Sequence, residues 1–188
     1  MGKVLRVDLS AEKWKVEELP EGVMRDFVGG NGFAAYTLFN ELKPGIDPLG
    51  PENILIFATG PLTGTAFPSS GRWAAYAKSP LTTAIWGEAH SGGQWGPELK
   101  YAGFDAIIIT GRAEKPVWLW IDDGEVEIRD ASHLWGKDVF DTDEIIKQEI
   151  GDETLKAIYI GPAGEKLVRL ACIMDSLYRA PGAAASGP

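Results

Sequence analysis

Two glycine-rich segments carry the residues best suited to holding an anionic ligand. The first, residues 60–78, reads GPLTGTAFPSSGRWAAYAK and presents Arg72 at the start of an expected strand. Backbone N–H groups of such a loop, together with a planar guanidinium, suit bidentate contact with a phosphate. A structural loop with a surface arginine would have the same sequence. Composition alone favours this simpler interpretation.

The second segment, residues 89–96, reads AHSGGQWG and places Gly92 and Gly93 before a short helical run. Unpaired N–H groups at a helix start bind anions, and glycine permits close approach. The segment matches neither a Walker loop nor a dinucleotide-binding fingerprint. His90 could ligate a metal or carry a proton, but a lone histidine is more often structural. The other histidine, His133, is distant in sequence.

No complete catalytic apparatus accompanies these segments. The single Cys172 excludes an intrachain disulfide and any all-cysteine metal or cluster site within the chain. It lies in the apolar run KLVRLACIM, where we expect a buried small hydrophobe rather than a reactive thiolate. Trp73, Trp86 and Trp95 surround the glycine-rich segments and could wall a flat ligand, although tryptophans are most simply core aromatics.

Composition excludes several classes of protein. The 188 residues carry a net charge of −9, which argues against a sequence-independent nucleic-acid binder and against docking on an anionic membrane. No apolar run approaches the ~18 residues needed to span a bilayer. The N-terminus MGKVLRVDLS has charges where a signal peptide has its apolar stretch. We therefore expect a cytoplasmic protein without nucleic-acid or membrane partners.

Hydrophobic periodicity predicts an α+β fold, because runs of strands alternate with grouped helices. Helices are expected between residues 20 and 42, on either side of a glycine turn, and at 142–150 with Thr142 as its cap. Strands are expected at residues 4–9, 14–19, 53–60, 72–79, from 84 onward, 104–111, 115–122, 124–130, 155–161 and 166–174.

The strand and helix patterns of the two halves suggest an internal pseudo-duplication. Residues 3–59 and 104–174 each contain paired strands, then a helix, then further strands. The final residues, APGAAASGP, have the composition of a flexible tail.

Several motifs occur together in the order of a known family. They are ATGPLTGTAFPSSGRW, KSPLTTAI, EAHSGGQWGPELKYAGFDAIIITGRAEKPVWLWI, DASHLWGKDV and IGPAGEKLVRLACIM. From Gly2 to about Gly182 the chain resembles the N-terminal domain of the aldehyde ferredoxin oxidoreductase family. The resemblance implies an α+β base built around two β-sheets. It implies a tungstopterin-binding domain at residues 1–178, followed by a truncated or divergent tail at residues 179–188.

Members of this family use tungsten, or in some cases molybdenum, to oxidise aldehydes to carboxylic acids. They pass the electrons through a [4Fe–4S] cluster to ferredoxin, and a paired pterin cofactor lies on the N-terminal domain. The resemblance places Arg72 beside the pterin and between it and the cluster. It places the HSGG segment against the pterin phosphates and the Mg²⁺ that bridges them; these residues are His90, Ser91, Gly92 and Gly93.

The chain departs from the family pattern at two places. Many members have asparagine at the position of His90, which the resemblance assigns to the magnesium. The family's Arg-Ala-Ala-Gly-Arg-Gly-Gly phosphate loop is matched by Arg179, Ala180 and Gly182, whereas residues 183–185 are alanines. The cluster cysteines and the acid–base residues belong to further domains, and a chain with one cysteine cannot build a four-cysteine cluster.

The expected function is therefore that of a pterin-cofactor-binding domain of an aldehyde oxidoreductase, inactive as an isolated fragment. Its expected partners are the C-terminal domains, ferredoxin and an aldehyde, within a homo-oligomeric parent. An alternative is a non-catalytic accessory module that binds a pterin cofactor or passes it on. A third is a degenerate remnant without function. The sequence specifies neither the aldehyde nor the choice between tungsten and molybdenum.

Overall fold

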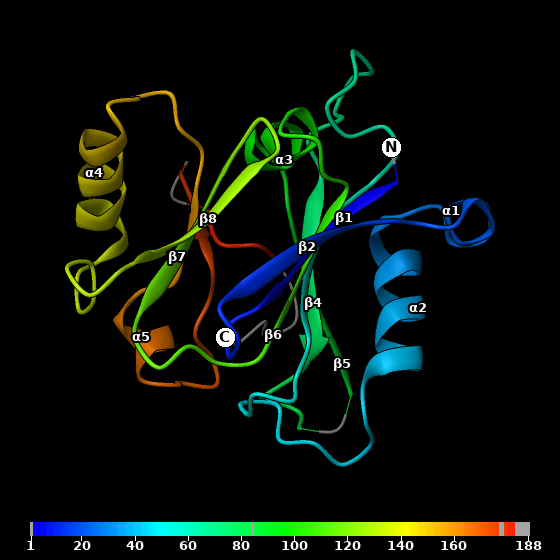
Figure 1. The fold of residues 1–188 in the computed structure, drawn as a ribbon, viewed down its shortest axis with the longest axis horizontal. Coiled ribbons are helices and arrows are strands. Elements are labelled where there is room, and N and C mark those ends of the chain that lie inside the picture. The colour runs from blue at the N-terminus through cyan, green and yellow to red at the C-terminus, as the bar shows by residue number, and fades with distance from the viewer. Residues whose placement is uncertain (1, 84, 177–178, 183–188) are drawn as a thin grey trace.

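The elements of the fold stack as successive layers. The computed structural model describes residues 2–83, 85–176 and 179–182. Figure 1 shows helix α2 (Gly30–Glu41) on one side of a large sheet and a two-stranded hairpin on the other, with α4 (Val139–Ile150) beyond the hairpin. The apolar clusters of the core fill the spaces between these layers.

The large sheet has six strands in the order β2-β1-β6-β3-β4-β5. They are β1 (Lys3–Asp8), β2 (Lys13–Glu18), β3 (Leu55–Thr59), β4 (Trp73–Lys78), β5 (Trp86–Ser91) and β6 (Ala106–Thr110). Strand β6 lies between β1, to which it is parallel, and β3, to which it is antiparallel. The other neighbours in the sheet are antiparallel.

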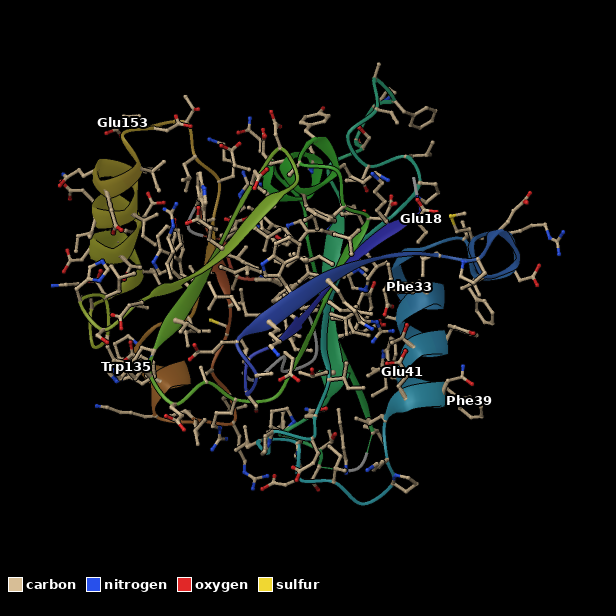
Figure 2. The ribbon with its side chains drawn as sticks, in the orientation of Figure 1. Glu18, Phe33, Phe39, Glu41, Trp135 and Glu153 are labelled. Carbon is tan, nitrogen blue, oxygen red and sulfur yellow. The ribbon has the colours of Figure 1, made fainter. Side chains whose placement is uncertain are left out.

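Helix α2 covers one face of this sheet and follows α1 (Glu21–Phe27) after a glycine turn. Phe33 of α2 is buried against the sheet, whereas Phe39, on the other side of the helix, is 90% exposed. The two side chains point in opposite directions in Figure 2. The buried cluster on this face includes Phe33, Ala34, Leu38, Ile56, Tyr76 and Ile108.

The opposite face of the sheet packs against α3 (Trp95–Tyr101) and the hairpin of β7 (Val117–Asp122) and β8 (Glu125–Asp130). Because side chains alternate along a strand, Leu119 and Ile121 face the large sheet, whereas Trp118 and Trp120 belong to the cluster beneath α4. The remaining elements are β9 (Ile158–Tyr159), α5 (Pro162–Glu165) and β10 (Met174–Asp175). Strands β9 and β10 form a second two-stranded sheet.

The α+β class predicted from the sequence is confirmed, as are the first hairpin, the helix pair and the Asp-Asp-Gly hairpin. Strand β6, from the second half of the sequence, lies in the sheet formed by the first half. The two halves therefore do not form separate sheets, and the internal duplication stays a prediction. None of the described helices is long and apolar enough to cross a membrane.

Two local predictions are wrong. Helix α4 begins at Val139, and its cap is Asp138, whose carboxylate accepts the N–H groups of Phe140 and Asp141. Thr142 lies inside the first turn, where its hydroxyl donates to the carbonyl of Asp138. Asp138, four residues before Thr142, therefore offers the better acceptor for the unpaired N–H groups of the first turn.

The expected strand at residues 166–174 is also absent, since only Met174 in this stretch belongs to a strand. Short helix α5 begins at Pro162, and irregular backbone follows it. Cys172 is consequently exposed, so its prediction as a buried hydrophobe is wrong.

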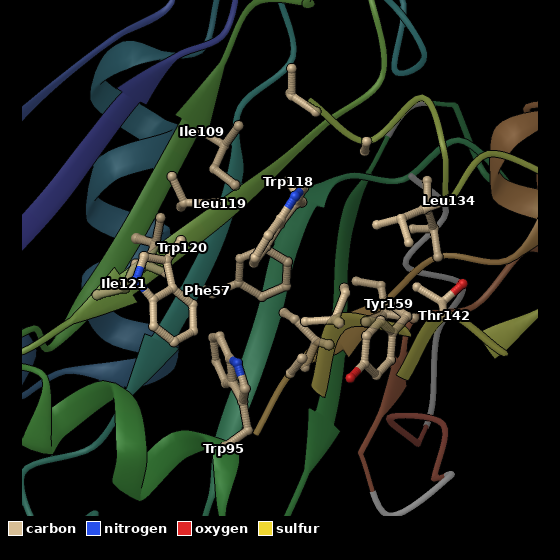
Figure 3. Close-up of a pocket in the computed structure, with 18 of the residues that line it drawn as sticks. Phe57, Trp95, Ile109, Trp118, Leu119, Trp120, Ile121, Leu134, Thr142 and Tyr159 are labelled. Atoms are coloured by element: carbon tan, nitrogen blue, oxygen red, sulfur yellow. The ribbon is translucent and has the colours of Figure 1, made fainter. Parts of the chain in front are cut away.

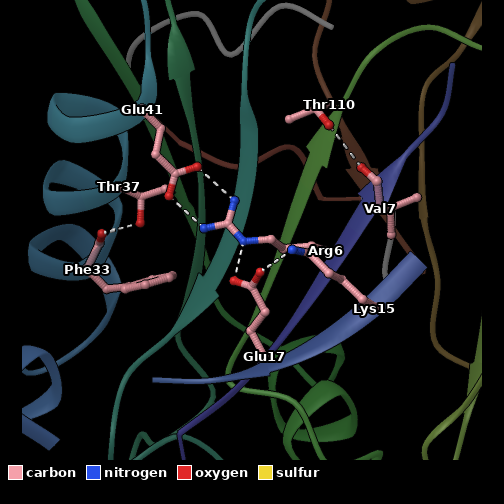
Figure 4. Close-up of polar contacts among 8 residues, drawn as sticks. All are labelled: Arg6, Val7, Lys15, Glu17, Phe33, Thr37, Glu41 and Thr110. Atoms are coloured by element: carbon pink, nitrogen blue, oxygen red, sulfur yellow. Dashed lines mark hydrogen bonds and ion pairs between the residues drawn. The ribbon is translucent and has the colours of Figure 1, made fainter. Parts of the chain in front are cut away.

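A fork of ion pairs ties the first hairpin to α2 (Figure 4). The Arg6 guanidinium donates to both carboxylate oxygens of Glu41 at 2.7 and 2.6 Å and to Glu17 at 2.5 Å. Hydrogen bonding to Glu41 raises the pKa of Arg6 above its ordinary value. One side chain of β1 therefore holds β2 and α2 in place.

Replacement of Arg6 by lysine tests this fork. Arg6→Lys keeps the charge but loses the planar bidentate geometry, so we expect the free energy of unfolding to fall by about 1 kcal/mol, a value reduced for partial solvent exposure. Urea denaturation measures the change. Arg25→Lys is the matched control, because its pair with Asp26 is exposed and should contribute nothing measurable. Equal effects of the two variants would contradict the assignment.

Candidate functional site

The register of β4 and β5 brings the two glycine-rich segments together at one end of the large sheet. Trp73, the first residue of β4, pairs with Ser91, the last residue of β5. Arg72 immediately precedes this pair on one strand, and Gly92 follows it on the other. The backbone around Arg72 and the Gly92–Gly93 turn therefore lie side by side, although they are separate in the sequence.

Glycine is required where these two segments touch. A Cβ atom at Gly71 would lie 2.4 Å from the carbonyl oxygen of Gly93, closer than real Cβ contacts. Gly93 has a φ of +89°, which side chains of other residues rarely adopt. A Cβ at Gly96 would lie 3.1 Å from Cβ of Trp73. The three glycines together allow the loop before β4 to pack directly on the turn after β5.

Gly92 has a different environment, because no atom lies within 4 Å of the position its Cβ would take. The N–H groups of Gly92 and Gly93 donate to no other residue that the structure describes. The predicted helix follows as α3, and Gln94 precedes it without a side-chain cap. The backbone of this turn is therefore open on the side where a ligand can approach.

Arg72 presents an exposed side chain beside this turn. Its guanidinium forms no ion pair within the described ranges of the chain. Its carbonyl accepts the hydroxyl of Thr63 at 2.8 Å, and the same hydroxyl oxygen accepts the N–H of Gly60 at 3.1 Å. Thr63 thus anchors the long loop while leaving the Arg72 guanidinium available for a ligand.

The last described residues of the chain reach the same end of the sheet. The N–H of Gly182 donates to the carbonyl of His90 at 2.7 Å, and the N–H of His90 donates to the carbonyl of Gly182 at 3.1 Å. All of the predicted site residues therefore come into one region. The alanines predicted to replace the second half of the family's phosphate loop, residues 183–185, lie outside the described residues.

Asp175 is a member of this region that sequence reasoning missed. The residue is 3% exposed, and its carboxylate accepts the Ser91 hydroxyl at 3.4 Å and the N–H of Arg179 at 3.1 Å. Its own N–H donates to the carbonyl of Arg179 at 3.0 Å. The sequence contains no signal that Asp175 contacts Ser91, because the two residues are far apart in the chain. The only visible feature of Asp175 was that a carboxylate directly follows an apolar run.

His90 and Ser91 direct their side chains to opposite faces of the sheet, since consecutive strand residues alternate. The His90 imidazole faces α2, with Nε2 3.5 Å from the Glu88 carboxylate. Glu88 also accepts the side-chain N–H groups of Asn31 and Trp86, each at 2.9 Å. Ser91 instead faces Asp175. One ligand therefore cannot contact both side chains, and it reaches both residues only through their backbone.

Tyr76 completes the polar network around Glu88. Its hydroxyl donates to Oδ1 of Asn31 at 2.6 Å, and its ring lies edge-on to the His90 ring. Burial, followed by the nearby Glu88 carboxylate, raises the pKa of Tyr76 above its ordinary value. In the described part of the chain, no group of three or more His, Cys, Asp or Glu side chains could hold a metal ion. Magnesium at His90 stays a prediction.

The three tryptophans near the site do not form one wall. Trp73 and Trp95 pack with ring centroids 4.7 Å apart, and both contact Phe57 on the α3 face of the sheet. Trp86 packs on Tyr76 on the α2 face, with ring centroids 5.2 Å apart. The suggestion that they wall a flat ligand together is therefore wrong, because the sheet separates them.

Comparison with known proteins gives consistent matches along almost the whole chain. The model of the aldehyde ferredoxin oxidoreductase N-terminal domain matches residues 4–188. A tungsten-containing aldehyde ferredoxin oxidoreductase of Pyrococcus furiosus is 51% identical over 181 residues, which make up 96% of this chain and 30% of the relative. The WOR-like subunit of an aliphatic sulfonate oxidoreductase of the same organism is 41% identical, over 96% of this chain and 31% of the relative.

A solved structure also matches almost the whole chain. The active-site complex BamBC of benzoyl coenzyme A reductase, in complex with 1,5-dienoyl-CoA, aligns with a TM-score of 0.93 and 38% identity. The alignment covers 98% of this chain and 28% of the solved chain. The chain thus spans about 30% of the length of the curated relatives that it matches.

Alanine substitutions at Gly71 and Gly92 test the geometry of the site. We expect Gly71→Ala to lower the free energy of unfolding by about 1–3 kcal/mol, because its Cβ would overlap the Gly93 carbonyl. Gly92→Ala should change it by less than about 0.5 kcal/mol, because its Cβ meets open space. Chemical denaturation of both variants measures the difference. Equal destabilisation would show that the two backbones do not approach in this way.

Proposed function

This chain belongs to the aldehyde ferredoxin oxidoreductase family, whose N-terminal domain it matches, and we propose that it holds the pterin cofactor of a tungsten- or molybdenum-dependent oxidoreductase. The proposed cofactor-binding domain covers residues 1–178. Residues 179–182, which the sequence assigns to a divergent tail, contact it through His90 and Asp175.

The observation that carries the proposal is the position of Arg72 beside the open Gly92–Gly93 turn, next to the Trp73–Ser91 pair at one end of the large sheet. The pterin cofactors of this family carry phosphate groups. A guanidinium without a partner among the described residues supplies a planar pair of donors for a phosphate. The two glycine N–H groups supply further donors without a side chain to obstruct approach. These features fit an anionic group.

The remaining site residues have supporting roles in this proposal. Ser91 and Asp175 hold the Arg179–Gly182 segment against the end of β5, where Arg179 and Gly182 add phosphate contacts. His90 lies at the magnesium that accompanies the phosphates, through its backbone or its imidazole. When bound, the tungsten or molybdenum supplies the oxygen-transfer and redox chemistry, while the protein orients the cofactor.

For the whole enzyme we propose oxidation of aldehydes to carboxylic acids with ferredoxin as the electron acceptor. This chain spans about 30% of its curated relatives, and the rest of the enzyme would supply the [4Fe–4S] cluster, the acid–base residues and most substrate contacts. The isolated chain would then hold cofactor without turning over substrate. The parent enzyme is proposed to be cytoplasmic and homo-oligomeric.

Replacement of Arg72 tests the cofactor site. In the full-length enzyme, Arg72→Ala should lower the tungsten or molybdenum and pterin content per polypeptide several-fold, because a charged phosphate contact is lost. Arg72→Lys should retain more cofactor than alanine, since it keeps the charge but not the fork. Metal analysis and pterin fluorescence give the two contents.

Arg25→Ala, at another exposed arginine far from the site in sequence, is the control and should leave both contents unchanged. Thermal unfolding of the apo forms should be alike for all of these variants. Full cofactor content in Arg72→Ala would refute the assigned site.

A further inference from the structure

A cavity of about 470 Å³ opens between strands β7 and β9 (Figure 3). Its lining contains every residue of the stretches 116–121 and 155–160. A pocket on the face of a strand would receive only alternate residues, because side chains alternate between faces. Consecutive residues line this cavity, so it lies along the edges of both strands and has the form of a slot.

The backbone of β7 presents unpaired groups to this slot. The N–H of Ala131 donates to the carbonyl of Pro116, directly beside the Val117–Asp130 pair. This bond identifies the residues of β7 whose backbone groups bond to β8. Because bonded pairs alternate along an antiparallel ladder, Val117, Leu119 and Ile121 direct their N–H and C=O groups away from β8. These groups point toward the slot.

The same reasoning applies to β9. The N–H of Ser176 donates to the carbonyl of Ala157, so the next bonded pair is Tyr159 with Met174. Ile158, between them, directs its backbone groups away from β10 and toward the slot. In the portion of the chain that the structure describes, neither β7 nor β9 has a neighbour on this side.

The large sheet contains a strand at the corresponding position. In the first half, hairpin β1–β2 and helix α2 precede β3, and β6 fills the space between β1 and β3. In the second half, hairpin β7–β8 and helix α4 precede β9, and α2 and α4 each have 12 residues. Gly60–Pro61 follows β3 and Gly161–Pro162 follows the β9 stretch, at the same spacing from Glu52 and Glu153. No described strand of the second half corresponds to β6.

We propose that this slot receives a β-strand from the part of the longer polypeptide outside these 188 residues. The strand would lie between β7 and β9 as β6 lies between β1 and β3, parallel to β7 and antiparallel to β9. It would join both two-stranded sheets into one. The inference rests on the proposal that the chain is the cofactor-binding part of a longer enzyme. The curated relatives are about three times as long as the part that this chain matches.

The apolar surroundings of the slot define the chemistry of the strand. The large sheet and hairpin provide apolar side chains on one side, and the cluster beneath α4 provides them on the other. An inserted strand must therefore be apolar on both faces, as the β6 sequence AIIIT is. The indole N–H of Trp118, buried without an acceptor among the described residues, also lies at this slot.

The outer edge of the large sheet shows what an uncovered edge looks like in this protein. Strand β2, with the sequence KWKVEE, carries lysines and glutamates that disfavour pairing with another chain. Strand β7 has no charged residue before Asp122. An apolar edge of this length, if left open, would be a site for aggregation. Strand β7 therefore has the composition of an edge that a further strand covers.

Hydrogen exchange tests the proposal residue by residue. In the 188-residue chain, the amides of Val117, Leu119 and Ile121 should exchange at least about tenfold faster than those of Trp118 and Trp120, whose N–H groups bond β8. In the full-length enzyme, both sets should exchange slowly. Mass spectrometry with electron-transfer fragmentation resolves the individual amides.

Val16 of β2 is the matched control, because its N–H points outward from an edge that we expect to stay uncovered. It should exchange rapidly in both proteins. Rapid exchange of Leu119 in the full-length enzyme would overturn the proposal. Protection of Leu119 in the 188-residue chain that rises with protein concentration would also overturn it, by identifying a second copy as the occupant. Neither result would alter the cofactor content that tests the function proposed above.

Discussion

The candidate site depends on a backbone contact that only glycine permits. Gly71 and Gly93 approach so closely that a single added carbon would collide with a carbonyl oxygen. This contact sets the loop that ends in Arg72 beside the turn that follows β5. Without it, the guanidinium and the open amides of Gly92 and Gly93 would be separate surface features, with no common ligand. The first role of these glycines is thus to let two backbone segments pack together, and contact with a ligand depends on that packing.

The parts of this arrangement that follow from local chemistry were predictable from the sequence. The glycine pair before a helix, the Asp-Asp-Gly hairpin and the buried strands all have short-range signals. The contacts of Asp175 with Ser91 and of Gly182 with His90 have none, because they depend on how distant segments meet. The strand predicted at residues 166–174 is absent for a local reason. Its apolar composition suits a strand, but Pro162 starts a helix just before it, and Leu167 has a φ of 54° that breaks an extended backbone.

The side chains of the candidate site are divided between the two faces of one sheet. The polar network of Tyr76, Asn31, Glu88 and His90 lies on the α2 face, whereas Ser91 and Asp175 lie on the other. The open backbone lies at the end of the sheet, between the two. Relatives that share this domain have names that refer to aldehydes, aliphatic sulfonates and benzoyl coenzyme A. The domain is thus shared by relatives whose names refer to different compounds.

The position of β6 also sets an order of events during synthesis of the chain. Strands β1 and β3 are both translated before β6, yet each depends on β6 as its neighbour in the completed sheet. The parallel pairing of Val4 with Ala106 closes a loop that spans more than half of the chain. Because closing a long loop costs conformational entropy, we expect this pair of strands to form late in folding. Until Thr110 has left the ribosome, the nascent hairpin and β3 expose open edges to every other chain nearby.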